Sequence, residues 1–508
     1  MWEMAVETEL KMRIAPEQLA RLKRHVLLKT HSFSRPVTRR LQNIYYDTPK
    51  LELYQSGLAL RLRHIGRQWL QTLKGGGSVQ AGLHVRNEWE VPVVNAKLDF
   101  SVSPEVDWDE LLQPSLRRKL KPVFVTDFSR NSRVLDFRGA QIELCIDQGE
   151  VRTEQRSSPI CELELELKSG TQQKLFEFAQ AILEIVPFEL EPVSKAERGY
   201  RLLSGYADSP VKGVAPALAA TDTLAEVLKK LIWSCVQHFQ SNLHGAMASD
   251  DDEYLHQMRV ALRRLRVVLR MAEKVRADRT LAALNKEVSA LCVALGKIRE
   301  WDVFISQTVK PMCARMASHA GLQTLLDASE RQRASCYAAL RSEDKGREMQ
   351  RLLLRFAIWM NGPYWKQAGF EQSPKDFAAR RLRKFANRFS RSGQDLGTAD
   401  AASLHALRII AKKLRYSAEF FAALYDKLKV ESFVDALSKV QDVLGQINDI
   451  AVAHHLLDGL AGVSALSDHQ EAIVLARGWI AHDLSGQLAD LRKTISGFVK
   501  QPEFWDIN

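Results

Sequence analysis

The chain has 508 residues, which is too many for a single hydrophobic core, so two or more domains are expected. Its 46% hydrophobic and 26% charged residues are typical of a soluble globular protein. No apolar run reaches the roughly 18 residues that a membrane span needs, so we expect no membrane partner. A net charge of +11 favours a polyanionic partner.

The first ten residues, MWEMAVETEL, are acidic and lack the basic-then-apolar pattern of a secretory signal. The six cysteines show no CxxC spacing and no metal-site pattern. We therefore expect reduced thiols and a cytoplasmic protein.

Up to about residue 204 the apolar residues recur mostly with a period of two, which is typical of strands. The predicted strands span residues 5–13, 38–47, 58–64, 69–74, 84–93, 123–128, 132–137, 141–147 and 159–168. Helical segments are predicted at 16–28, near 104–120 and at 171–186. So many short strands predict an antiparallel barrel or a strongly curved sheet.

The glycines of LKGGGS are no phosphate-binding P-loop, because no Gly-Lys-Ser/Thr follows them and no helix begins there. A flexible hairpin turn over Gly75–Ser78 is the interpretation we adopt.

Residues 205–220 contain Pro210, Gly213 and Pro216 and are predicted to be a linker. We therefore assign residues 1–204 to a barrel domain and 221–508 to an all-α domain, an α+β protein overall. The second domain should contain eight to ten helices, the first of them capped by Thr221 or Asp222.

The helical half contains an internal repeat. LHQMRVALRRLR begins at Leu255 and LHALRIIAKKLR begins at Leu404, so His405 follows His256 by 149 residues. The glycines of LGKIRE and LGQIND, Gly296 and Gly445, are also 149 residues apart. Duplication predicts two related helical bundles packed together.

Carboxylates alternate with apolar residues in two predicted strands, ETELK and CELELELK. Because strand side chains alternate between faces, each strand places its carboxylates and a lysine on one face. Rows of carboxylates repel one another unless water or a hard cation such as Mg²⁺ or Mn²⁺ neutralises them.

Other strands carry the same one-sided charge: Arg61 with Arg63, and Arg86 with Glu88 and Glu90. One interpretation is a barrel with an apolar core and a charged surface. The interpretation we favour is a polar, ligand-holding interior under helices that cover an apolar outer wall. The apolar faces of those helices carry Leu19, Leu22, Val26, Leu175, Phe178 and Ile182.

The motif ETELK resembles the ExExK signature of the triphosphate tunnel metalloenzymes, the CYTH superfamily. NIYYDT, GLALRLR, QTLKGGG, TDFSR, IDQGEV, CELELEL and SKAERGY extend the resemblance over residues 4–204, to the inorganic triphosphatase branch. The resemblance implies an eight-stranded antiparallel tunnel. It also implies metal-dependent hydrolysis of inorganic triphosphate to pyrophosphate and phosphate.

The resemblance also implies roles for individual residues. Metal ligands would be Glu7, Glu9, Glu164 and Glu166, with Glu162 either a ligand or at the tunnel mouth. Phosphate contacts would come from Lys11, Arg61, Arg63, Lys74, Arg130 and Lys195, from either Arg39 or Arg40, and more weakly from Arg133. Catalytic roles would fall to Lys11, Glu88, Glu90 and Asp147, the carboxylates orienting or deprotonating water.

The repeat places basic residues on one helical face with 3-4-3 spacing. They are His256, Arg259, Arg263 and Arg266 in the first copy and His405, Arg408, Lys412 and Arg415 in the second. They are either a solvated face paired with Glu300, Asp302 and Asp449, or an anion site. The repeated pattern resembles the CHAD domain over about 222–500, which implies binding of inorganic polyphosphate.

Two alternatives stay open. In the first alternative, the barrel hydrolyses an organic triphosphate, for example thiamine triphosphate, or is an adenylate cyclase-type enzyme. In the second, the protein is a non-catalytic binder of polyphosphate or nucleic acid. Nucleic acid is the less favoured partner because no aromatic residues are interleaved with the basic stripes.

Overall fold

The computed structural model describes residues 5–33, 35–101, 108–394 and 401–505. The chain divides into two compact units, which we call the barrel unit and the helical unit. The barrel unit comprises Met1–Ser209 and Gly346–Gly362, and the helical unit comprises Pro210–Lys345 and Pro363–Asn508. Each is described by itself.

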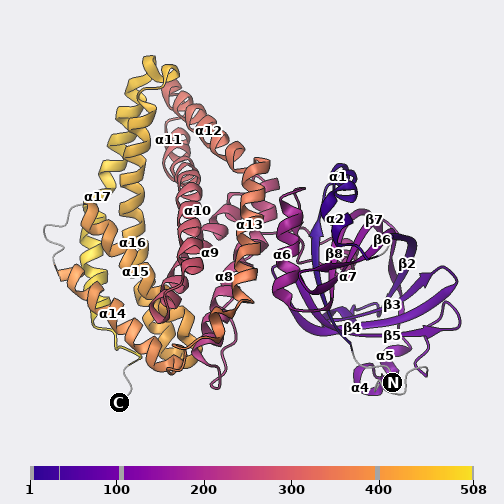
Figure 1. Cartoon of the computed structure of the whole chain (residues 1–508). Helices are drawn as coiled ribbons and strands as arrows, with labels where there is room; N and C mark the ends of the chain where they lie inside the picture. The colour runs from indigo at the N-terminus through magenta and orange to yellow at the C-terminus, as the bar shows by residue number, and fades with distance from the viewer. Residues whose placement is uncertain (1–4, 34, 102–107, 395–400, 506–508) are drawn as a thin grey trace. The chain divides into compact units, whose positions relative to one another are not determined.

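Eight of the described strands form a closed antiparallel barrel, which confirms the α+β class and the predicted barrel (Figure 1). Their order is β5-β4-β3-β2-β6-β7-β8-β1, and pairing of β1 with β5 closes the ring. The short strand β9 (Glu189–Leu190) pairs with β1. The barrel strands are β1 (Ala5–Arg13), β2 (Val37–Asp47), β3 (Leu58–Ile65), β4 (Gln68–Gln80), β5 (Leu83–Val93), β6 (Lys121–Phe137), β7 (Ala140–Arg152) and β8 (Ser157–Ser169).

Two strand predictions were wrong in detail. Residues 123–128 and 132–137 belong to the single strand β6, because the residues between them pair without interruption with β2 and β7. The glycines of LKGGGS lie inside β4, where the register shifts between Gly75 and Ser78, and the hairpin turn lies at Ala81–Gly82. Gly77 has a φ of +98°, and a Cβ there would lie 1.8 Å from the Val85 carbonyl oxygen, so this bulge requires glycine.

Short helices accompany the barrel. They are α1 (Leu19–Arg24), α2 (Val26–His31), α3 (Glu52–Gln55), α4 (Trp108–Leu111), α5 (Pro114–Arg117), α6 (Gln172–Leu183), α7 (Lys195–Ser204) and most of α13 (Glu343–Met360). The predicted helix 16–28 is broken, because His25 is extended between α1 and α2. The prediction near 104–120 is reduced to α4 and α5, and residues 102–107 lie outside the described part.

The outer wall of the barrel is apolar and helix α6 covers part of it. Leu175, Phe178 and Ile182 of α6 are fully buried, and this helix contacts β1, β7 and β8. The strand residues alternate accordingly, so that Leu144 and Leu165 are buried outside while their sequence neighbours face inward. Val26 departs from the prediction, because 64% of it is exposed where the helix breaks.

The helical unit is built from long helices (Figure 1). They are α8 (Leu224–Ala248), α9 (Asp252–Val275), α10 (Arg279–Phe304), α11 (Lys310–Arg315), α12 (Ala320–Leu340), α14 (Pro374–Gln394), α15 (Ala401–Phe421), α16 (Lys427–Leu460) and α17 (Gln470–Val499). A π-helical turn, Ile305–Val309, joins α10 to α11. Helices α8, α9, α10 and α12 pack in sequence, as do α14 to α17.

The duplication is visible in three dimensions. Helix α15 begins 149 residues after α9, and the pair α15–α16 packs as α9–α10 does. The first helix of the unit is capped by Thr223, in a capping box with Glu226, rather than by Thr221 or Asp222. Asp222 instead binds Lys230.

Within the described residues, no single helix has the length and apolar character to cross a membrane. Lys427–Leu460 and Ser464–Ala481 together pass by length and composition, but they are bent by 112°.

Candidate functional site

The barrel interior is a charged cavity of about 300 Å³. It is lined by side chains from the inward faces of the strands, so the predicted polar interior is confirmed. Its charged lining comprises Glu7, Glu9, Lys11, Arg61, Arg63, Lys74, Arg86, Glu88, Glu90, Arg130, Glu143, Glu164, Glu166, Lys168 and Lys195. Carboxylates and cations occur there in similar numbers.

One wall of this cavity carries a row of carboxylates across three neighbouring strands. Glu9 of β1 lies directly opposite Glu166 of β8, and Glu166 lies directly opposite Glu143 of β7. Like charges directly opposite on paired strands destabilise a sheet, so the row requires cations. Here Lys11 contacts Glu9 at 2.8 Å, and Lys168 contacts Glu166 at 2.6 Å and Glu143 at 3.1 Å.

Glu7 extends this row and lacks full compensation. Burial and the charges of Glu9 and Glu88 raise its pKa to about 7, although Lys74 acts in the opposite direction. Burial would also raise the pKa of Glu9, but the neighbouring Lys11 lowers it to about 2. A further cation beside Glu7 and Glu9 would therefore be stabilised, and hard divalent ions prefer carboxylate ligands.

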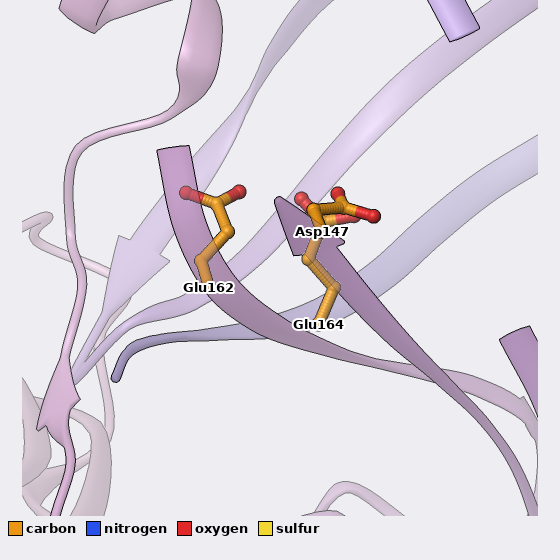
Figure 2. Close-up of side chains that lie close together, drawn as sticks. All are labelled: Asp147, Glu162 and Glu164. Atoms are coloured by element: carbon orange, nitrogen blue, oxygen red, sulfur yellow. The ribbon is translucent and has the colours of Figure 1, made fainter. Parts of the chain in front are cut away.

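A second carboxylate cluster lies among Asp147, Glu162 and Glu164 (Figure 2). Their ligand oxygens lie within 4.8 Å of one another and all three residues are buried. The Lys195 ammonium already occupies this cluster, at 2.6 Å from Asp147 and 2.9 Å from Glu164, and it also contacts Glu162. Arg130 adds two hydrogen bonds to Asp147, at 2.8 and 2.6 Å.

These two groups differ in their fit to a metal ion. An ion among Asp147, Glu162 and Glu164 would have to displace the buried Lys195 ammonium. Lys168, the cation beside Glu143 and Glu166, is partly exposed and can turn into solvent. The row therefore fits a resident cation better. The sequence analysis did not include Glu143 among the metal ligands. The cross-strand register is what reveals it.

The predicted phosphate-binding cations Lys11, Arg61, Arg63, Lys74, Arg130 and Lys195 all line the cavity. Arg61 lies 3.4 Å from Glu88, and Arg63 lies 3.3 Å from Glu90. Arg63 also donates a 2.9 Å hydrogen bond to Asn43, and Glu90 accepts one of 2.8 Å from Thr72. The cations are thus aimed inward and held by carboxylate or amide partners.

Four predicted tunnel residues are not on the cavity wall. Asp147 and Glu162 are fully buried and held by cations, so neither faces the space where water would be activated. Arg133 is on the outer face: it lies three residues from Arg130 on a strand and directly opposite Leu144. Burial lowers the pKa of Arg133.

The remaining one of these four is Arg39. It lies directly opposite Arg130 on β6 but lines a separate surface hollow that also includes Arg40 and Arg67. Arg40 is engaged by Asp127 through hydrogen bonds of 3.0 and 2.9 Å.

The helical unit contains a second cavity, of about 580 Å³. Both copies of the repeat contribute to it: His256, Arg259 and Arg263 from α9, and His405 and Arg408 from α15. Sequence reasoning did not identify Arg299 as a lining residue. Arg266, Lys412 and Arg415 are not on its wall, and Arg415 lies 3.5 Å from Glu419 instead.

The cations in and beside this cavity lower one another's pKa. Burial and Arg263 lower the pKa of Arg259 to about 10. Burial, Arg263 and Arg408 lower the pKa of Lys412 to about 6. The acids expected to neutralise the stripes do so only weakly, since Asp449 lies 4.0 Å from Arg408 and Asp302 is bound to Arg333 at 2.6 Å. The cavity therefore has an excess of positive charge.

The first of the repeated glycines lies close to its arginine, whereas the second is only at ordinary contact distance. A Cβ on Gly296 would lie 2.9 Å from Arg259, and a Cβ on Gly445 would lie 4.0 Å from Arg408. Asn448, which departs from the arginine of the first copy, instead lies 3.0 Å from His405 in a side-chain hydrogen bond. The duplication thus preserves the arginine position while its surroundings have diverged.

A closed barrel with a charged interior and a duplicated helical module with a cationic cavity together define a two-module protein class. The family model of the CYTH domain matches residues 5–200 and that of the CHAD domain matches residues 230–458. The chain therefore carries a CYTH domain followed by a CHAD domain.

Two relatives illustrate the likeness. The chain is 34% identical over 203 residues to the inorganic triphosphatase of Haemophilus influenzae; the match covers 39% of this chain and 55% of that protein. The chain thus spans about half the length of this curated relative. The crystal structure of the CHAD domain from Ricinus communis has a TM-score of 0.51 at 29% identity, covering 58% of this chain and 99% of that one.

Proposed function

We propose that the barrel hydrolyses inorganic triphosphate to pyrophosphate and phosphate with Mg²⁺ or Mn²⁺, and that the helical cavity binds inorganic polyphosphate. The observation that carries the proposal is the barrel cavity in which the row Glu9, Glu166 and Glu143 meets inward-facing lysines and arginines. The similarity to an inorganic triphosphatase supports the same reaction.

Glu7, Glu9, Glu143 and Glu166 would hold the divalent ion, which would withdraw charge from the phosphoryl oxygens. Arg61, Arg63 and Lys74 bind the phosphate chain by exchanging carboxylate partners for phosphate oxygens. Guanidinium groups grip such oxygens in a bidentate fork, and the ammonium acts as a point charge. Because the interior is enclosed, each of these contacts is stronger than in water.

Lys11 and Lys195 act on the negative charge that develops during phosphoryl transfer. Both ammonium groups are buried among carboxylates, Lys11 at 2.8 Å from Glu9 and Lys195 at 2.9 Å from Glu164. They stabilise the negative charge that spreads over the phosphoryl oxygens during transfer. Glu88 and Glu90 line the cavity and would orient or deprotonate the attacking water.

The helical cavity serves a different role. Its excess of positive charge suits a flexible polyanion, and it holds two histidines and several arginines from both repeats. Such binding should weaken steeply with salt, because bound counterions are released. The +11 net charge of the whole chain supports the same class of partner, and we place the protein in the cytoplasm.

The decisive experiment is phosphate release from tripolyphosphate, thiamine triphosphate and ATP by the full chain, with Mg²⁺, with Mn²⁺ and with excess EDTA. Metal-dependent release that is fastest with tripolyphosphate is expected. Faster release from an organic triphosphate would establish the alternative enzyme, and undiminished rates in EDTA would refute the metal role. Binding of long-chain polyphosphate to the same protein tests the helical cavity.

A further inference from the structure

Part of the wall of the helical cavity is apolar and would make no favourable contact with inorganic polyphosphate. Besides its cations, the cavity is lined by Ile450 and Val452 of α16, by Trp479 and Ile480 of α17, and by Gln307. Phosphate chains carry no apolar surface, so apolar side chains gain nothing from contact with them. A ligand that uses the whole cavity has an anionic part and an apolar part.

Of these residues, Trp479 says most about the kind of ligand that the cavity would bind. Its side chain is 37% exposed although tryptophan is among the most strongly buried residue types on average, and it stacks on no other aromatic ring in the described part of the chain. An indole with an accessible face is a platform for a planar base, because every nucleobase has a π-face. The guanidinium groups of Arg259, Arg263 and Arg408 line the same cavity.

Uncharged polar groups complete this wall. The π-helical turn Ile305–Val309 brings Gln307 and Thr308 to the cavity, and Gln446 of α16 joins them. Single π-helical turns inside α-helices frequently mark functional sites. An amide offers both a donor and an acceptor, which is what the edge of a base requires.

We propose that this cavity binds nucleoside polyphosphates, with the phosphate chain on the arginines and histidines of the two repeats and the base stacked on Trp479. This inference rests on the anion-binding role proposed above and adds nucleoside polyphosphates as a second class of ligand. At about 580 Å³ the cavity has the size of small-molecule sites in general. A mononucleotide, rather than a nucleic acid strand, matches one aromatic platform in a bounded cavity.

The test compares ATP with tripolyphosphate, which carries a similar charge but no base. Calorimetry on the full chain, carrying Arg61→Ala and Arg63→Ala to weaken the barrel site and kept in EDTA, isolates the helical cavity. We expect ATP to bind more tightly than tripolyphosphate. Trp479→Ala should weaken ATP binding about 5- to 150-fold, the range for loss of one stacked base, and leave tripolyphosphate binding unchanged.

Matched variants keep the result interpretable. Trp479→Phe should retain most of the ATP preference, whereas Trp479→Leu, which keeps apolar volume without a comparable ring, should lose it. Val474→Ala changes a residue of α17 that is 66% exposed and not on the cavity wall, and it should change neither affinity. Arg408→Ala should weaken the binding of both ATP and tripolyphosphate.

Two results would overturn the inference. One is an ATP affinity no higher than that of tripolyphosphate, and the other is an equal effect of Trp479→Ala on both ligands. Neither result bears on whether polyphosphate binds. The proposed polyphosphate role fails separately, if long-chain polyphosphate does not bind the unmodified protein while ATP does.

Discussion

The barrel and the helical unit contain the same types of cationic side chain in opposite electrostatic surroundings. In the barrel, burial opposes the charge of Lys11, but Glu164 and Glu9 outweigh it and raise the pKa of the lysine. In the helical unit, burial and two neighbouring arginines lower the pKa of Lys412 to about 6. One lysine is thus surrounded by carboxylates, and the other lies beside arginines.

The difference shows why the two sites suit different anions. The cations and carboxylates of the barrel interior occur in similar numbers, so under the proposed function a divalent ion would take over carboxylates when the anion binds. Arginines outnumber the carboxylates Glu300 and Asp449 on the wall of the helical cavity, so under the proposed function a polyanion would bind there without a metal. Net charge alone does not separate these cases, and the identity of each neighbour does.

The largest expected effect reverses sign between the two regions. Lys11→Met should destabilise the protein by about 3–5 kcal/mol, because it leaves the buried Glu9 without its lysine partner and leaves Glu164 with only Lys195 and Arg130. Lys412→Met should instead stabilise it by about 1–2 kcal/mol, less than the pKa shift alone implies because solvent screens a partly exposed group. Chemical denaturation of both variants measures this, with Lys11→Arg as the charge-preserving control. Destabilisation of equal size in both would contradict the contrast.

Removing three arginines that line the helical cavity, together with the neighbouring Lys412, should separate the two proposed functions. With Arg259, Arg263, Arg408 and Lys412 all changed to alanine, binding of long-chain polyphosphate should fall by about 1,000-fold or more, since several charge-assisted contacts are lost together. Triphosphatase activity should stay within about twofold. Fluorescence anisotropy and phosphate release on one preparation measure both. Undiminished polyphosphate binding would place its site elsewhere.

The metal ligands should matter most for the rate in the barrel. Glu9→Gln removes a carboxylate from the row with Glu166 and Glu143, and it should lower the triphosphatase rate by about 100-fold or more, roughly 3 kcal/mol of barrier. Folding should survive, because a like-charge contact is relieved. Glu143→Gln tests the ligand that the cross-strand register adds. A normal rate in both variants, with a normal response to EDTA, would refute the metal assignment.

Much of the barrel could be predicted because a period of two assigns side chains to faces. The inward placement of Glu7, Glu9, Arg61 and Arg63 follows from it directly. The period does not say which strands become neighbours, and so it could not show that Glu143 lies opposite Glu166. It also gives no depth along a strand, which is why Arg39, opposite Arg130, lies outside the cavity.

The helical unit shows a different limit. The 149-residue repeat predicted which residues correspond, and His256 and His405 do line one cavity. Trp479 lies outside the repeat units that the sequence revealed, and only packing of α17 brings it to the cavity. Sequence spacing therefore identified the cationic wall and missed the apolar one.

A smaller effect should distinguish substrate contacts from structural ion pairs in the barrel. Arg63→Ala should weaken triphosphate binding by about 1.5–3 kcal/mol, the range for charge-assisted hydrogen bonds. The melting temperature without ligand should be unchanged or higher, because relief of repulsion with the other cations of the cavity offsets loss of the 3.3 Å ion pair with Glu90. Kinetics of tripolyphosphate hydrolysis and thermal unfolding measure the two quantities. Lost stability with unaltered kinetics would make Arg63 a structural residue.

The smallest effect is a pH dependence confined to the helical cavity. The pKa of Lys412 is lowered in the fold to about 6, so the unfolded chain binds more protons between about pH 6 and its ordinary pKa. Stability should therefore rise with pH across that window, and Lys412→Met should abolish the rise.

A bound polyanion favours the charged lysine, so polyphosphate binding at pH 7 to 8 should take up a proton. Affinity should then fall as pH rises, by at most tenfold per unit for a single group. Calorimetry in buffers of different ionisation enthalpy measures that uptake, with Lys412→Arg as the control that stays charged. An uptake that persists unchanged in Lys412→Arg would assign it to another group, His256 and His405 being the titratable lining residues to change next.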